Sequence, residues 1–84
     1  MAEPLVIAAL AKNSRETLRI ALDNYRGHDL VDLRVCVPLA SHAPTLTPTK
    51  AGISIRLGLI PDLIAALQQA EARARELGLI EGAP

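Results

Sequence analysis

The sequence YRGHDLVDLR, from Tyr25 to Arg34, is followed after a proline-rich gap by PTKAGISIRL, from Pro48 to Leu57. In both stretches apolar residues alternate with polar ones, which is typical of a strand with one buried face. Each stretch places an arginine in its polar phase, at Arg34 and at Arg56. Side chains two residues apart on a strand share a face, so these arginines are predicted to lie on the surface of a sheet opposite its core.

The residues before these stretches predict two more strands. Leu5–Ala11 is an aliphatic run without a decisive period, which we interpret as a strand. Lys12–Glu16 is polar and predicts a bend, with a basic arm that touches nucleic acid as the alternative. Thr17–Asp23 alternates again and carries Arg19 in its polar phase. Gly27 tolerates positive φ, so it marks a hairpin turn that can bring Arg19 to the same face as Arg34.

The segment from Pro38 to Pro48 holds three of the six prolines. Proline cannot donate to a sheet ladder, so this segment is predicted to be a loop or an irregular edge strand. Gly52 then opens the last alternating strand, whose polar phase includes Arg56.

A helix is predicted from about Pro61 to Leu77, because proline suits the first turn of a helix and Gly78 suits its end. Its apolar residues recur at spacings of four and three, which forms one continuous stripe. We expect the stripe to pack on the sheet, on a partner's helix, or on both. It consists of Leu63, Leu67, Ala70, Ala74 and Leu77.

The composition predicts a homodimer. The chain has 84 residues, enough for one domain, and a domain this small buries only about 60% of the surface its unfolded chain exposes. Yet half of the residues are hydrophobic, almost all of them aliphatic, and the mean hydropathy is +0.26. Soluble proteins rarely leave large apolar patches exposed, so we expect a second copy to cover part of this surface.

Charge and cysteine content exclude several classes of protein. The net charge is zero, so no overall basic excess indicates a nucleic-acid partner. Cys36 is the single cysteine, which excludes an internal disulfide framework and favours a reducing compartment, the cytoplasm. Leu5–Ala11 is too short to span a membrane and follows Glu3, so no membrane anchor or signal peptide is expected.

No catalytic or metal-binding motif is found. Cys36 and the two histidines, His28 and His42, do not show the spacing of metal ligands or of a nucleophile and its base. We therefore expect no enzymatic activity, no metal and no cofactor, and we interpret Cys36 as a small packing residue.

Two long segments together resemble a known family. KNSRETLRIALDNYRGHDLVDLRV begins at Lys12, and PTKAGISIRLGLIPDLIAAL begins at Pro48. They are similar to the C-terminal domain of the transcriptional positive cofactor 4 (transcriptional coactivator p15) family, bacterial branch, over roughly Lys12 to Ala70. The matching parts are an aromatic-basic-glycine turn before the "DLVDLR" strand, and a basic-glycine-isoleucine-serine strand ahead of a leucine-rich helix.

This resemblance implies an α+β fold in which a curved antiparallel four-stranded sheet is followed by one C-terminal helix. It implies one domain, with a core at about residues 12–77 and a tail at 78–84, that dimerises through its helices. It also implies a sequence-tolerant single-stranded DNA-binding protein of the transcriptional coactivator type. RNA as a ligand, contact with the transcription machinery and association with the nucleoid stay open.

The resemblance carries nucleic-acid-binding roles onto particular positions, to which the alternation of the last strand adds Arg56. Tyr25 is predicted either to stack on a base or to cap the sheet edge. The predicted binding residues are Arg19, Tyr25, Arg26, His28, Arg34, Lys50 and Arg56.

Departures from the family pattern support a second hypothesis. Cys36 and Val37 stand where relatives usually carry a tryptophan, and Ala51 stands where a second basic residue often precedes the glycine. A base stacked on an aromatic ring contributes about 1 to 3 kcal/mol, so Tyr25 alone should give weaker binding. The alternative function is a protein-interaction or scaffold dimer that kept the fold and lost strong nucleic-acid binding.

Overall fold

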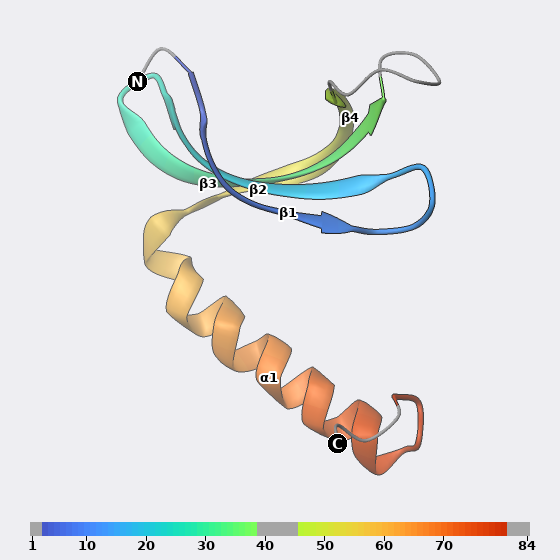
Figure 1. Ribbon diagram of the computed structural model, residues 1–84. Helices are drawn as coiled ribbons and strands as arrows, with labels where there is room; N and C mark the ends of the chain where they lie inside the picture. The colour runs from blue at the N-terminus through green and yellow to red at the C-terminus, as the bar shows by residue number, and fades with distance from the viewer. Residues whose placement is uncertain (1–2, 39–45, 81–84) are drawn as a thin grey trace.

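The computed structural model describes residues 3–38 and 46–80. Four antiparallel strands form one sheet in the order β1-β2-β3-β4, and a single long helix follows (Figure 1). This confirms the predicted fold class. The elements are β1 (Leu5–Ala11), β2 (Thr17–Tyr25), β3 (His28–Pro38), β4 (Leu46–Arg56), the short 3-10 turn η1 (Leu57–Leu59) and α1 (Ile60–Glu76).

A two-residue turn joins β2 to β3. Arg26 and Gly27 have φ angles of 52° and 83°, and positive φ at both central residues is the geometry of a type I′ turn, which matches the twist of paired strands. The Asn24 side chain supports it, accepting from the Gly27 N–H at 3.2 Å and donating to Asp29 at 2.9 Å. The predicted reversal at Gly27 is confirmed, and the turn also forces Arg26 into the left-handed region.

The predicted bend between β1 and β2 is also confirmed. The Asn13 side chain accepts hydrogen bonds from the backbone N–H groups of Arg15, at 2.9 Å, and Glu16, at 2.8 Å. Lys12 donates to the Glu16 carboxylate at 2.9 Å. The bond from Lys12, followed by a second one from the Asn13 amide at 2.6 Å, lowers the pKa of the Glu16 carboxyl. The segment is therefore a hydrogen-bonded connection between two strands, which is the first of the two interpretations above.

β4 differs from the prediction in its length. The alternation suggested a strand that opens at Gly52, but β4 begins at Leu46 and contains Pro48. β4 is an edge strand, and an edge is where a sheet tolerates a proline that cannot donate. Of the two alternatives left open for the proline-rich segment, its last residues form the irregular edge strand, while residues 39–45, including His42, lie outside the described residues.

The irregularity of β4 has a defined position. Arg34 pairs with Gly52 whereas Cys36 pairs with Pro48, so residues 49–51 of β4 stand against the single residue Val35 of β3. We call Thr49–Ala51 the β4 bulge. The Thr49 hydroxyl donates to the Val35 carbonyl at 2.8 Å and accepts from the Ala51 N–H at 3.1 Å. The first bond holds the bulge against β3, and the second closes the bulge on itself.

The helix α1 matches its prediction to within one residue at each end. Pro61 lies in its first turn, where the absent N–H breaks no hydrogen bond. At the other end Gly78 has a φ of 72°, the Leu79 N–H donates to the Ala74 carbonyl at 2.8 Å, and the Gly78 N–H donates to the Arg75 carbonyl at 3.1 Å. This pair of bonds is the Schellman motif, which satisfies carbonyls at a helix end.

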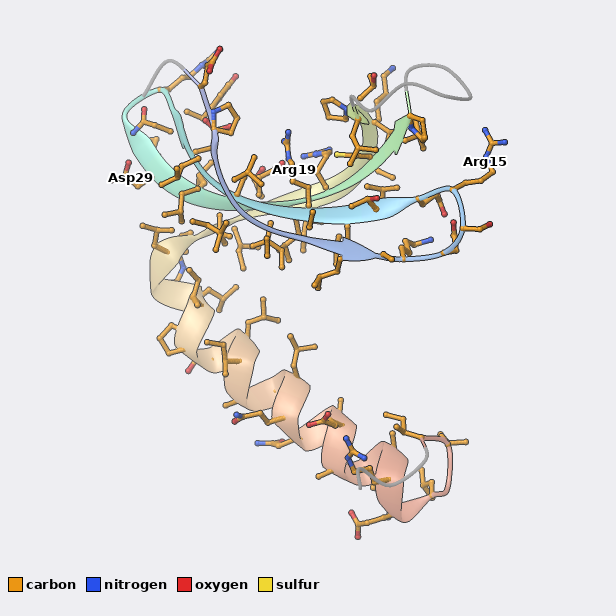
Figure 2. All side chains as sticks on the ribbon, viewed as in Figure 1. Arg15, Arg19 and Asp29 are labelled. Atoms are coloured by element: carbon orange, nitrogen blue, oxygen red, sulfur yellow. The ribbon has the colours of Figure 1, made fainter. Side chains whose placement is uncertain are left out.

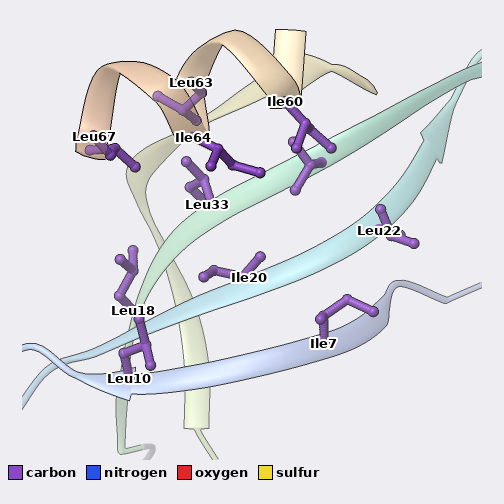
Figure 3. Close-up of a pocket in the computed structure, with 11 residues that line it drawn as sticks. Ile7, Leu10, Leu18, Ile20, Leu22, Leu33, Ile60, Leu63, Ile64 and Leu67 are labelled. Atoms are coloured by element: carbon purple, nitrogen blue, oxygen red, sulfur yellow. The ribbon is translucent and has the colours of Figure 1, made fainter. Parts of the chain in front are cut away.

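The helix leaves the convex side of the curved sheet and extends away from it (Figure 1). Its first half and the apolar face of the sheet line an open cavity of about 520 Å³ with an entirely apolar lining (Figure 3). Only this first half of the helix stripe therefore faces the sheet, and it does so across the cavity and not in close packing. The lining residues are Ile7, Leu10, Leu18, Ile20, Leu22, Val31, Leu33, Ile60, Leu63, Ile64 and Leu67.

The described residues bury little apolar surface. Ala21, Val31 and Cys36 are the buried hydrophobic residues among them, and Leu67 is 60% exposed. The accessible surface is 6595 Å², against about 4,800 Å² expected for a compact monomer of this mass. The radius of gyration is 15.2 Å, against about 12 Å for a compact domain of this length. A single chain therefore leaves much of its aliphatic surface in water.

Within residues 3–38 and 46–80, no helix has the length and apolar character that crossing a membrane requires.

Candidate nucleic-acid interface

The polar face of the sheet is its concave side, opposite the helix. The antiparallel register places Arg19 of β2 directly opposite Arg34 of β3, and Asp32 of β3 opposite Ser54 of β4. Figure 2 shows the Arg19 side chain standing on the concave side of the sheet. The prediction that Arg19 and Arg34 share a face is therefore confirmed. Like charges directly opposite each other destabilise a sheet unless a third group compensates.

Asp32 is that third group. Its carboxylate accepts from Arg34 Nη2 at 2.7 Å and Nε at 3.3 Å, and from Arg19 Nη2 at 3.4 Å. The Ser54 hydroxyl also donates to it, at 2.9 Å. Asp32 is only 6% exposed, and the hydrogen bond from Arg34, more than any other interaction, holds the pKa of this carboxyl below its usual range. The three charged groups together carry a net charge of one.

Arg34 also binds the backbone of β4. Its Nη1 donates to the carbonyls of Thr49, at 3.3 Å, and Lys50, at 3.2 Å. Four of the five N–H donors of its guanidinium are therefore engaged within the protein. Gly52, opposite Arg34, makes this reach possible, since a Cβ there would lie 3.1 Å from Arg34 Cζ and 2.3 Å from the Leu33 carbonyl oxygen. Any side chain at Gly52 would obstruct the guanidinium.

Arg19 is held much more loosely than Arg34, although both side chains are 21% exposed. Its one hydrogen bond, to Asp32, is long at 3.4 Å, and its Nε is buried without a partner among the described residues. The three other N–H donors on its Nη atoms are therefore left for an incoming acceptor, whereas the buried Nε is out of reach of a ligand. Of the two facing arginines, Arg19 is the better placed to bind a phosphate.

The hairpin tip is a separate basic group at the far end of β2 and β3. Tyr25 pairs with His28 across the turn, and the Arg26 guanidinium carbon lies 5.2 Å from the centre of the Tyr25 ring, a cation–π distance. Tyr25 is 60% exposed. Six residues of extended strand separate it from Arg19, about 20 Å. The tip and the centre of the sheet are therefore distinct contact points along one surface.

The two remaining predicted residues lie on β4. Arg56 is the last residue of β4 and pairs with Leu30 of β3. Its guanidinium lies close to Gly58, where a Cβ would stand 2.8 Å from Arg56 Nη1. Lys50 is exposed in the β4 bulge, where its carbonyl accepts from Arg34. The register thus places Arg56 on the side of the hairpin tip and Lys50 beside the central arginines.

Three residues that shape this face were absent from the predicted binding residues, although alternation placed the first two in the polar phase: Asp32, Ser54 and Gly52. Asp32 could have been suspected, because it lies two residues before Arg34 in the same polar phase and side chains at that spacing meet on a strand. Ser54 and Gly52 gave no such signal, because their contacts depend on the pairing of β3 with β4. Cys36 is 1% exposed, in agreement with its interpretation as a packing residue.

No group of histidine, cysteine, aspartate and glutamate side chains suited to a metal ion occurs within the described ranges.

No protein-family model matches this chain, and no curated protein matches it. Solved structures do match. The PC4 homolog BPSL1147 from Burkholderia pseudomallei, in its tetragonal crystal form, is 33% identical over 82% of this chain and 98% of that chain, with a TM-score of 0.70. The chain belongs to the PC4 family. The orthorhombic form of the same homolog is 32% identical over 84% of this chain and 93% of its own, with a TM-score of 0.73.

Membership of the PC4 family confirms the resemblance found in the sequence and accounts for the four-stranded sheet with one C-terminal helix. In this PC4 protein a compensated central cluster, Arg19–Asp32–Arg34, lies on the concave face, and exposed cations occur at the hairpin tip and in the β4 bulge.

Proposed function

We propose that this PC4 protein binds single-stranded DNA along the concave face of its sheet, without strong preference for base sequence. The proposal rests on one observation above all: Arg19 and Arg34 stand opposite each other on the concave side, in a chain of the PC4 family. A cationic surface on adjacent strands can follow a phosphate backbone, and an exposed aromatic ring can stack on any base.

The compensated cluster limits how strong the binding can be. Because Asp32 neutralises one of the two central arginines, the cluster counts as a single charge, to which Lys50, Arg26 and Arg56 add one each. About three or four released counterions correspond to a log–log salt slope of about −2 to −3 for a single strand. Tyr25 offers one free ring face for stacking, because Arg26 covers the other.

A fluorescence-anisotropy titration tests this function. A labelled single-stranded oligonucleotide of mixed sequence is titrated with the full chain at several salt concentrations, with the matching duplex as the control. We expect micromolar or tighter binding to the single strand at low salt, weaker binding to the duplex, and the slope given above. No binding at micromolar protein, or an affinity that does not change with salt, would reject the proposal.

We further propose that the active form is a homodimer, in which the second copy covers the apolar face of the sheet and the helix stripe. The large exposed aliphatic surface supports it, as does the 520 Å³ apolar cavity that opens between the sheet and α1. The helix residues in question are the predicted Leu63, Leu67, Ala70, Ala74 and Leu77, to which Ile60 and Ile64 are added because they line the same cavity.

The second candidate function is a protein-interaction or scaffold dimer. One observation favours it: Arg34, a residue to which the family resemblance assigns DNA binding, has four of its five donors engaged within the protein. The same titration, together with sedimentation of the free protein, separates the two functions. A scaffold dimer would sediment as a dimer but would leave the oligonucleotide unbound.

The family suggests a role in transcription or in the handling of unpaired DNA, in the cytoplasm, and we include this in the proposal. A non-enzymatic binding role is consistent with it. Single-stranded RNA is the competitor to use when the preference between DNA and RNA is measured.

A further inference from the structure

The two facing arginines of the concave face are bound very differently, and this inference rests on the proposed DNA binding. Arg34 makes four hydrogen bonds, two to Asp32 and two to backbone carbonyls of β4. Arg19 makes one long bond to the same carboxylate. Two residues of the same type and the same exposure therefore have different freedom to meet a ligand.

The partners of Arg34 form a continuous connection between β3 and β4. Asp32, on the same strand, receives two bonds from the guanidinium and one from Ser54 of β4. On its other side the guanidinium reaches the carbonyls of Thr49 and Lys50, inside the β4 bulge. Because Gly52 has no side chain, there is space beside it for the Arg34 guanidinium to reach these carbonyls.

The β4 bulge needs such support. Residues 49–51 stand against the single residue Val35, so the regular ladder of backbone bonds is interrupted there. β4 is an edge strand, so no further strand supports it from outside. Among the described residues, the Arg34 guanidinium and the Thr49 hydroxyl are the side-chain groups that bond the bulge to β3.

We propose that Arg34 is a positioning residue and not a phosphate ligand: it fixes the β4 bulge and thereby holds Lys50 in place to bind the DNA backbone together with Arg19. The planar guanidinium suits this task, because it presents several donors in fixed directions, whereas a lysine at the same place would supply one compact charge. Arg34 therefore contributes to DNA binding indirectly, by positioning Lys50.

The proposal is tested first on the free protein, without DNA. Backbone order parameters from NMR relaxation are compared for the wild type, Arg34→Lys and the matched control Arg19→Lys, each of which keeps its charge. We expect the order parameter of Lys50 to fall from about 0.85, typical of a rigid backbone, toward about 0.6 in Arg34→Lys. It should be unchanged in Arg19→Lys. An unchanged order parameter in Arg34→Lys would overturn the proposal.

The second arm is a double-mutant cycle of oligonucleotide affinity with Arg34→Lys, Lys50→Ala and the double variant. We expect Arg34→Lys to weaken binding about two- to fivefold in the wild-type background and to have almost no effect when Lys50 is already alanine. The same loss in both backgrounds would show that Arg34 binds DNA independently, which overturns the proposal.

Two further results have defined meanings. If the wild type binds no oligonucleotide, the proposed function fails, and the order parameters alone then decide the positioning role. If Arg34→Lys does not fold, as judged by its thermal melt, Asp32→Asn replaces it, because it keeps the side-chain shape and removes the charge that anchors Arg34. Asp32→Asn must also lower the order parameter of Lys50, and an unchanged value overturns the proposal.

Discussion

Arg19 and Arg34 lie directly opposite each other on β2 and β3, and a single carboxylate, that of Asp32, binds both guanidinium groups. The arrangement turns a repulsive pair into a cluster of net charge one. It also buries the Asp32 carboxylate, and this burial is tolerated because the carboxylate accepts four hydrogen bonds. The stability of the sheet and the charge of its concave face therefore depend on the same residue.

Asp32→Asn is expected to lower the free energy of unfolding by about 1 to 3 kcal/mol at neutral pH, because two partly buried guanidinium groups lose their charged acceptor. Urea titrations of the wild type and the variant measure this. The matched control is Asp29→Asn, which removes an exposed carboxylate from the same strand and should change stability little. Equal effects of the two substitutions would mean that the cluster contributes no special stability.

The pH dependence of the same titrations follows from the lowered pKa of Asp32, whose ordinary value is 3.8. A carboxyl with a lower pKa in the folded state adds stability above its unfolded pKa, and this stability is lost as the pH falls through the folded pKa. We therefore expect the wild type to lose stability as the pH falls below about 4, and the loss to be smaller in Asp32→Asn. Parallel curves for the two proteins would contradict this.

Arg26 connects stability with binding at the hairpin tip. A non-glycine residue at a φ of 52° is strained, and asparagine before glycine is the preferred pair in a type I′ turn. Arg26→Asn should therefore raise the free energy of unfolding by about 0.5 to 1 kcal/mol. The same change should weaken oligonucleotide binding, because it removes a cation that lies over Tyr25.

The control for this pair of measurements is Arg26→Lys, which keeps both the charge and the strain. It should leave the stability nearly unchanged and retain most of the affinity. A variant Arg26→Asn that binds as tightly as the wild type would place the DNA away from the hairpin tip.

Leu67 tests the proposed dimer. It lies on the apolar stripe of α1, lines the cavity and is 60% exposed in the single chain. Leu67→Glu should shift the protein from dimer to monomer in sedimentation equilibrium, because a buried unpaired carboxylate opposes association strongly. Ala65→Glu is the matched control, on the opposite side of the helix, and should leave the dimer intact. A monomeric wild type, or equal behaviour of the two variants, would reject the helix stripe as the interface.

Much of the fold could be predicted because its signals are local. Alternation with a period of two identified the strands around Arg19, Arg34 and Arg56, and spacings of three and four identified the helix stripe. Gly27 and Gly78 indicated a turn and a helix end because glycine adopts positive φ without strain. Both have positive φ in the structure. The early part of β4 was left open between a loop and an irregular edge strand, because the tolerance of Pro48 in a strand depends on which strand lies at the edge of the sheet.

The candidate site divides in the same way. That Arg19 and Arg34 belong to one polar face follows from the order of residues along each strand, because the period of a strand is a property of the backbone itself. Arg34 uses most of its donors within the protein, whereas Arg19 does not. This difference depends on contacts across strands, such as the bond between Ser54 and Asp32, which are 22 residues apart. The pairing register and the β4 bulge create those contacts, and they exist only once β3 and β4 have come together.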